Sequence, residues 1–152
     1  MKLRFALVLA LSMLSPSGYS QESVSFCDLF RNPQKYDGKE VTVRATWRYG
    51  FEWSQFYCLD CSLKEMTWLE ISPELDDRST AVLKRTPKAG IVNITVQGVF
   101  QSGGHFGHLN SYPNRFVARR VSYFAIVSNG MKSLEDERNA EKQWVCGGSN
   151  PK

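Results

Sequence analysis

Hydrophobic and polar residues alternate along several segments of the chain, and this alternation predicts β-strands. Residues 40–48 give the clearest case, because apolar residues occupy every second position and threonine or arginine occupies most positions between them. The apolar positions are Val41, Val43, Ala45 and Trp47. Residues 91–100 alternate in the same way, and residues 115–127 are expected to form a last long strand. Two shorter segments, residues 53–59 and 67–71, are rich in the aromatic and β-branched residues that favour strands. The pattern therefore predicts five strands.

Two other segments repeat their apolar residues at helical spacing. Within residues 26–31 they recur at i, i+3 and i+4, and Asn32 and Pro33 are expected to end this short helix. A second segment begins at Pro73 with three acidic residues near its start and lysine or arginine near its end, which suits the helix dipole. Residues 134–142 are also helix-prone. We therefore expect helices before the first strand, between the third and fourth strands, and after the fifth.

The order of these elements resembles one known architecture. Five strands with a helix between the third and the fourth is the order found in the OB-fold, a small and partly open Greek-key barrel. We therefore expect a mainly β protein with a five-stranded OB-fold-like barrel, a short N-terminal helix and a C-terminal helical tail. The expected division is a signal peptide at residues 1–20, the OB-like barrel domain at residues 21–128 and a helical or disordered tail at residues 129–152.

The N-terminal segment has the layout of a secretory signal peptide. Lys2 and Arg4 precede a ten-residue apolar run at residues 5–14, and Gly18 and Ser20 stand where a signal peptidase prefers small residues. The run covers only about half of a ~30 Å hydrocarbon core, so it does not predict a membrane anchor. We expect an exported protein, periplasmic or secreted, that begins at Gln21 and is soluble after cleavage.

Length and charge exclude several classes of protein. The chain has 152 residues, which suits one domain and excludes a multidomain enzyme. Without Lys2 and Arg4 it carries 17 basic and 15 acidic residues, a net charge of 17 − 15 = +2. This charge is too small to predict a nucleic-acid binder, which gains affinity by releasing counterions from many phosphates.

The first strand and two later segments carry a more specific resemblance. The residues are Asn32, Pro33, Tyr36, Gly38, Lys39, Val41, Val43 and Arg44, then Gly50-Phe51-Glu52-Trp53 with Cys58 and Cys61, and finally Gly103-Gly104-His105-Phe106-Gly107-His108-Leu109. This pattern resembles small exported bacterial proteins with an OB-fold-like domain, and more distantly the tRNA-anticodon-binding-like OB families. The resemblance covers about residues 25–127. It implies the fold and no catalytic residues, because OB-folds bind nucleic acids, saccharides and proteins.

Four cysteines remain after removal of the signal peptide: Cys27, Cys58, Cys61 and Cys146. An even number in an exported chain predicts disulfide bonds, and three pairings are possible. We favour a bond within the C-x-x-C motif, Cys58–Cys61, together with Cys27–Cys146. As an alternative, Cys58 and Cys61 could join His105 and His108 as four zinc ligands, or act as a thiol-redox pair.

A ligand-binding surface is predicted where two loops border the same side of an OB barrel. The loops are residues 49–52 and residues 102–113, whose glycines permit a close approach to the main chain. The candidate residues are Tyr49, Phe51, Glu52, Trp53, His105, Phe106 and His108. Two alternatives stay open. The aromatic rings on the second and third strands can be core residues, and the glycine-rich segment can be a flexible hairpin only.

No known hydrolase motif, neither G-x-S-x-G nor H-E-x-x-H, occurs in the chain. The sequence therefore predicts an exported, non-enzymatic binding or interaction module without a cofactor, whose partner is an unknown protein or small ligand. The competing hypothesis is the metal-binding or thiol-redox protein built on Cys58, Cys61, His105 and His108.

Overall fold

The structure is a computed structural model that describes residues 22–62, 66–129 and 146. It is mainly β, with a six-stranded mixed sheet and a few short helices. The strands are β1 (Ser23–Ser25), β2 (Glu40–Tyr49), β3 (Ser54–Tyr57), β4 (Thr67–Ile71), β5 (Gly90–Phe106) and β6 (Tyr112–Asn129). The helices are α1 (Phe26–Arg31), α2 (Pro33–Tyr36), α3 (Asp77–Leu83) and the 3₁₀ turn η2 (His108–Asn110).

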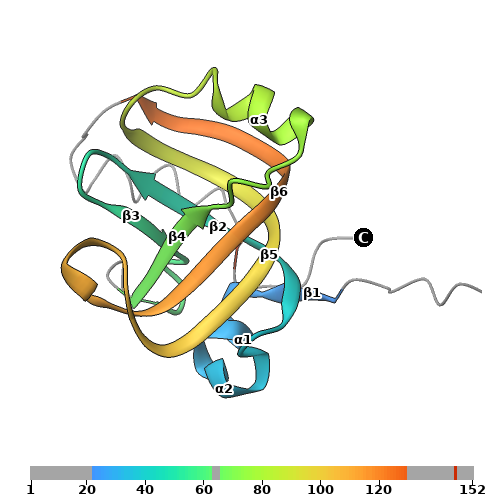
Figure 1. Ribbon diagram of the computed structural model, residues 1–152, viewed down its shortest axis with the longest axis vertical. Helices are drawn as coiled ribbons and strands as arrows, with labels where there is room; N and C mark the ends of the chain where they lie inside the picture. The colour runs from blue at the N-terminus through green and yellow to red at the C-terminus, as the bar shows by residue number, and fades with distance from the viewer. Residues whose placement is uncertain (1–21, 63–65, 130–145, 147–152) are drawn as a thin grey trace, which may run out of the picture.

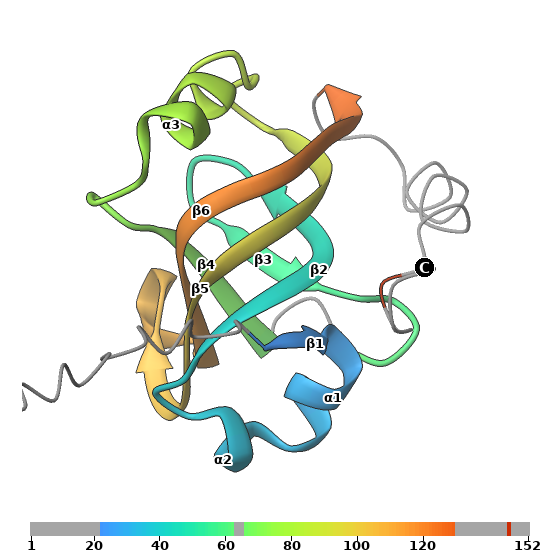
Figure 2. The ribbon, with the colours of Figure 1, turned by 90° about the vertical axis from the view of Figure 1, so that its right-hand side faces the viewer.

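The sheet runs in the order β1-β2-β3-β4-β6-β5, and β5 also pairs with β2, which makes the sheet partly ring-like (Figure 1). β2 pairs with β5 along its whole length, and β4 lies parallel to β6. The pairing of β5 with β6 is interrupted by register shifts, which let long strands bend. Helix α3 lies at one end of the ring, while α1 and α2 lie at the other (Figure 2).

The core is built from side chains that alternate inward along these strands and from the buried residues of α1. Phe26, Phe56 and Phe116 are fully buried, and the Phe56 ring lies 5.3 Å from Phe26 and 5.4 Å from Phe116 between centroids. Every second residue from Val41 to Trp47 is also buried. The alternation read from the sequence thus places β2 correctly, because one face of the strand packs against apolar neighbours.

Four features differ from the sequence prediction. Strand β1 was not expected, and it pairs in parallel with β2 at Thr42–Arg44. Pro33 does not only end a helix but begins α2, because its fixed φ suits a first helical position. Residues 102–113, expected as a loop, largely continue β5 and β6, whose last paired residues are Phe106 and Tyr112. The fourth difference, the disulfide pairing, is described below.

Some predictions are confirmed and others fall outside the described residues. Helix α3 begins at an acidic N-cap, since Asp76 accepts a hydrogen bond of 2.9 Å from the backbone N–H of Ser79. This contact lowers the pKa of Asp76. The expected signal peptide at residues 1–20 and the expected helix at residues 134–142 lie outside the described residues.

Candidate functional site

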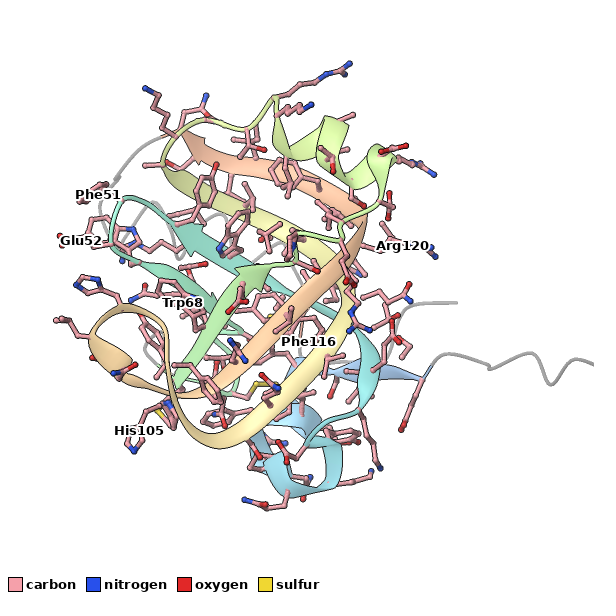
Figure 3. The ribbon with its side chains drawn as sticks, viewed as in Figure 1. Phe51, Glu52, Trp68, His105, Phe116 and Arg120 are labelled. Carbon is pink, nitrogen blue, oxygen red and sulfur yellow. A yellow bond between two sulfur atoms is a disulfide. The ribbon has the colours of Figure 1, made fainter. Side chains whose placement is uncertain are left out.

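Two turns frame one side of the sheet. Residues 50–53 connect β2 to β3, and residues 107–111 connect β5 to β6. In Figure 3, Phe51 and Glu52 lie above and His105 lies below on the same side of the molecule, with Trp68 of β4 between them. The two segments singled out in the sequence therefore flank the surface of β4 in this view.

The side chains at these turns project from the protein. Phe51 is 97% exposed and Leu109 is 81% exposed, the two highest values among the exposed large hydrophobic residues that the structure describes. Glu52, His105 and His108 are exposed as well. Covering large exposed apolar side chains is favourable, because it removes apolar surface from water. This combination of apolar tips and polar neighbours is therefore suited to contact with another molecule.

Two candidate aromatic residues lie deeper than expected. Tyr49 is 8% exposed and its ring stacks on Trp47 at 4.2 Å between centroids, so it belongs to the core. Burial raises the pKa of Tyr49 to about 12. Trp53 is half-buried and folds back over the turn, where a Cβ added at Gly50 would lie 2.7 Å from its ring. Of the aromatic residues in the first turn, Phe51 is thus the freely projecting one.

The turn between β5 and β6 rests on Trp68. Gly107 has a φ of 67°, and a Cβ added there would lie 2.4 Å from the Trp68 ring. The Trp68 ring also meets the edge of Tyr112 at 5.2 Å between centroids. Leu109 and Asn110, with φ of 53° and 55°, complete a left-handed bend that turns Leu109 outward. The bend therefore packs closely against Trp68 at Gly107.

A charged group lies beside this turn that sequence reasoning missed. The Arg115 guanidinium donates to Glu70 at 2.8 Å and to Gln101 Oε1 at 2.8 Å. It also lies 4.8 Å from the centroid of the Phe106 ring. Glu70 and Arg115 are far apart in sequence and meet because β4 and β6 are parallel neighbours, so no local pattern could have shown the pair.

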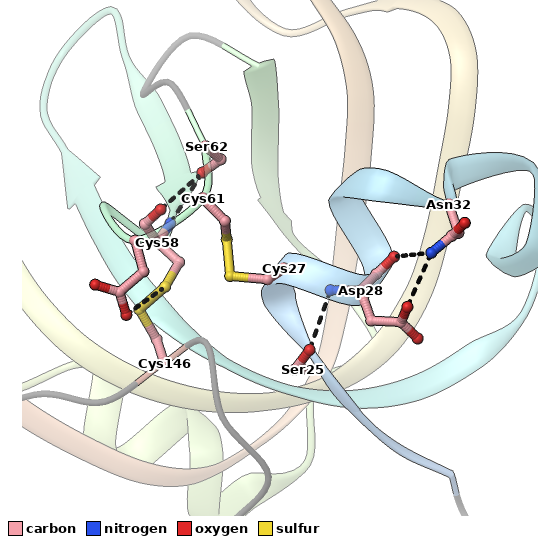
Figure 4. The surroundings of a disulfide bond; sticks show 9 residues. Ser25, Cys27, Asp28, Asn32, Cys58, Cys61, Ser62 and Cys146 are labelled. Carbon is pink, nitrogen blue, oxygen red and sulfur yellow. Dashed lines mark hydrogen bonds between the residues drawn. A yellow bond between two sulfur atoms is a disulfide. The ribbon is translucent and has the colours of Figure 1, made fainter.

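The four cysteines form two disulfides, as expected, but the favoured pairing is wrong. Cys27 bonds to Cys61 and Cys58 bonds to Cys146 (Figure 4). The two cysteines of the C-x-x-C motif therefore belong to different bonds. The Cys61 and Ser62 N–H groups both donate to the Cys58 carbonyl, at 3.0 and 2.9 Å, in the turn that follows β3.

The unexpected strand β1 explains the pairing. β1 and β3 share one edge of β2 and run toward each other, since Ser25 lies opposite Arg44 and Tyr57 lies opposite Thr46. The start of α1, which follows β1, is thereby brought to the turn that follows β3. Cys27 then meets Cys61, while the fully buried Cys58 is left for Cys146.

The proposed zinc set of Cys58, Cys61, His105 and His108 is not assembled. Among the described residues, the groups whose possible metal-binding atoms lie within 4.8 Å of one another are Cys27 with Cys58 and Cys61, and Cys58 with Asp60 and Cys146. Neither group contains a histidine. The histidines instead lie on the end of β5 and on η2.

Comparisons with protein-family models, with curated proteins and with solved structures gave no match. Within the described ranges, no helix has the length and apolar character needed to cross a membrane. The two disulfides are consistent with an oxidising compartment.

Proposed function

We propose that this chain is an exported, non-enzymatic binding module with an OB-like fold, and that it docks a partner protein through its two projecting turns. The name "tip surface" is used below for Phe51, Glu52, His105, His108 and Leu109. The observation that carries the proposal is the near-complete exposure of Phe51 and Leu109 on turns that flank β4.

The strand order supports the OB-like assignment. When β2 to β6 are counted as strands one to five, the neighbours follow the order one, two, three, five, four and return to one, with α3 between strands three and four. OB-folds bind ligands on the face of strands two and three and on the loops that border it. Phe51, Glu52, His108 and Leu109 lie on the corresponding loops, which connect strands one and two and strands four and five, and His105 lies at the end of strand four.

The shape of the tip surface favours a protein partner over a small molecule. Small-molecule sites are concave and bury most of their ligand, whereas Phe51 and Leu109 project outward. A projecting aromatic side chain can instead enter a pocket on a partner protein, where such residues often contribute much of the binding energy. Glu52, His105 and His108 supply polar contacts at the rim of such an interface.

Affinity capture from an extract of the native compartment tests this proposal. The mature chain serves as bait, and the Phe51→Ser and Leu109→Ser variants are compared with wild type by quantitative mass spectrometry. With bait at a concentration well below the wild-type dissociation constant, both variants are expected to lose about 90% of one specific captured protein, because a loss of 1.4 kcal/mol in binding free energy lowers the affinity tenfold. Their thermal unfolding should match wild type, since exposed positions contribute little to stability.

Ile126→Ser is the matched control. Ile126 is 49% exposed on β6, opposite Val92, outside the tip surface and at the opposite end of β6 from the turn that carries Leu109. This variant is expected to capture the same protein at the wild-type level. Equal loss in all three variants would show that capture follows general hydrophobic exposure, and equal capture by wild type and both tip variants would contradict the proposed surface.

A further inference from the structure

Sulfur atoms from three separate parts of the chain meet at one buried point. Cys27 comes from α1, Cys58 and Cys61 come from the end of β3 and its turn, and Cys146 comes from the C-terminal region. Cys27, Cys58 and Cys146 are at most 5% exposed. The four residues are called the sulfur cluster here. Figure 4 shows the two bonds side by side.

The spacing of the sulfur cluster is close to that of a tetrathiolate metal site. The Sγ atoms of Cys27, Cys58 and Cys61 lie within 4.8 Å of one another. Cys146 is not part of this group and is linked to it through its bond to Cys58. Four thiolates about 2.3 Å from a tetrahedral zinc ion lie about 3.8 Å from one another. Three of the four atoms therefore start near the spacing of a tetrahedral site, and Cys146 has to move toward Cys27 and Cys61 when its bond to Cys58 is reduced.

We propose that the reduced chain binds one zinc ion through Cys27, Cys58, Cys61 and Cys146, so that the disulfide form and a zinc form are alternative states of the sulfur cluster. Reduction of each disulfide takes two electrons and two protons from a dithiol, which becomes a disulfide itself. Zinc then displaces up to four protons from the four thiols. The resulting centre carries a net charge of −2, because one divalent cation meets four thiolates.

Zinc is the expected ion because its chemistry matches the donor atoms. Thiolates are soft ligands, and structural zinc sites are closed, four-coordinate and often formed by four cysteines that include a C-x-x-C pair. Asp60 is the competing ligand, since one carboxylate oxygen lies 3.7 Å from Cys58 Sγ. Asp60 is exposed, whereas three members of the sulfur cluster are buried. A closed site therefore favours the cysteines.

The experiment uses the mature chain reduced by a water-soluble phosphine without oxygen. The phosphine is oxidised to its phosphine oxide with oxygen from water as it reduces each disulfide to two thiols. Because the phosphine itself contains no thiol, it does not add a competing thiol ligand for the metal. Cobalt(II) is added as a spectroscopic probe, followed by zinc(II). We expect one cobalt per chain with the intense thiolate-to-metal absorption of a tetrahedral site, displacement of cobalt by zinc, and protection of all four cysteines from alkylation. The oxidised chain is expected to bind neither ion.

Single substitutions identify the ligands. Cys27→Ser, Cys61→Ser and Cys146→Ser are each expected to weaken zinc binding on the order of a hundredfold, because a closed site loses one of its four ligands. Asp60→Asn is the matched control at the same turn and should bind zinc as tightly as wild type. The double variant His105→Ala/His108→Ala should also keep one zinc per chain, which separates the sulfur cluster from the histidine set expected from sequence.

Several results would overturn the proposal. These are absence of metal from the reduced chain, binding that survives in Cys27→Ser and Cys61→Ser, and a loss in Asp60→Asn equal to that in the cysteine variants. If reduction unfolds the chain, zinc is expected to restore the far-ultraviolet circular dichroism of the oxidised protein, because zinc binding is coupled to folding. Failure of zinc to restore it would also contradict the proposal.

Discussion

The disulfide pairing can be tested with two double variants: a matched variant, which lacks both cysteines of one disulfide, and a mixed variant, which lacks one cysteine of each. The two variants are expected to differ in stability and in the number of free thiols. In the matched variant Cys27→Ala/Cys61→Ala, one bond is lost and Cys58–Cys146 remains. In the mixed variant Cys58→Ala/Cys61→Ala, both bonds are lost, and Cys27 and Cys146 remain without their partners. Both variants lack two cysteines, so their difference reports the pairing rather than the number of thiols removed.

The sequence separations set the expected magnitudes. The Cys27–Cys61 bond closes a separation of 34 residues, and loop entropy assigns it about 3.8 kcal/mol of stabilisation at 25 °C. The Cys58–Cys146 bond closes a separation of 88 residues and is assigned about 4.6 kcal/mol. Loss of both amounts to roughly 8 kcal/mol, which lies within the total stability of a typical domain, about 5–15 kcal/mol. The mixed variant should therefore be close to unfolding, whereas the matched variant should remain folded.

Urea unfolding followed by tryptophan fluorescence measures the loss of stability, and thiol titration of the denatured, unreduced chains counts free cysteines. We expect no free thiol in the matched variant and two in the mixed variant. The reverse result, two free thiols in the matched variant and none in the mixed one, would establish the pairing Cys27–Cys146 with Cys58–Cys61. It would refute the pairing described above.

Two further substitutions test the core and the turn beside the tip surface. Burial raises the folded-state pKa of Tyr49 to about 12, so the wild-type chain is expected to lose about 2 kcal/mol of stability as the pH rises from 10 to 12. The Tyr49→Phe variant has no phenol to ionise and should not show this loss, which unfolding titrations across this pH range measure. Gly107→Ala is expected to lower stability by about 1–3 kcal/mol, since it adds steric contact with Trp68 to the cost of a left-handed residue. Gly103→Ala is its control, since Gly103 also has a positive φ, of 70°, but nothing lies within 4 Å of an added Cβ.

Each of these predictions has an outcome that contradicts it. An unchanged alkaline stability curve in Tyr49→Phe would mean that the Tyr49 phenol ionises as easily in the folded chain as in the unfolded one. Equal losses in Gly107→Ala and Gly103→Ala would show that contact with Trp68 does not constrain the turn. The turn would then be the flexible hairpin considered in the sequence analysis.

Local patterns were enough to predict the long strands but not their full extent. The alternation in residues 40–48 predicted β2 because one face of that strand is buried, which is a property written into the residues themselves. Residues 102–106 contain two glycines and were expected as loop, yet they continue β5. Their pairing with β6 depends on the neighbouring strand, and glycine content alone does not show it.

The remaining differences come from contacts between distant segments. Three-residue β1 carries no periodic signal, and it forms because β2 offers an open edge at Thr42–Arg44. Its position decides the disulfide pairing, so the error in the strands caused the error in the cysteines. Within the candidate site, exposure of Phe51 and burial of Tyr49 also depend on how the turn folds, although both are aromatic residues in one short segment.

The central claim is that the chain acts by binding a protein through the tip surface, and site-specific photocrosslinking in the native compartment tests it most directly. A benzoyl-phenylalanine introduced in place of Phe51, Leu109 or Ile126 reports any protein that touches that position. The account predicts one defined protein adduct, shared by positions 51 and 109 and absent from position 126. Absence of adducts from positions 51 and 109, or the same adducts from all three positions, would contradict it.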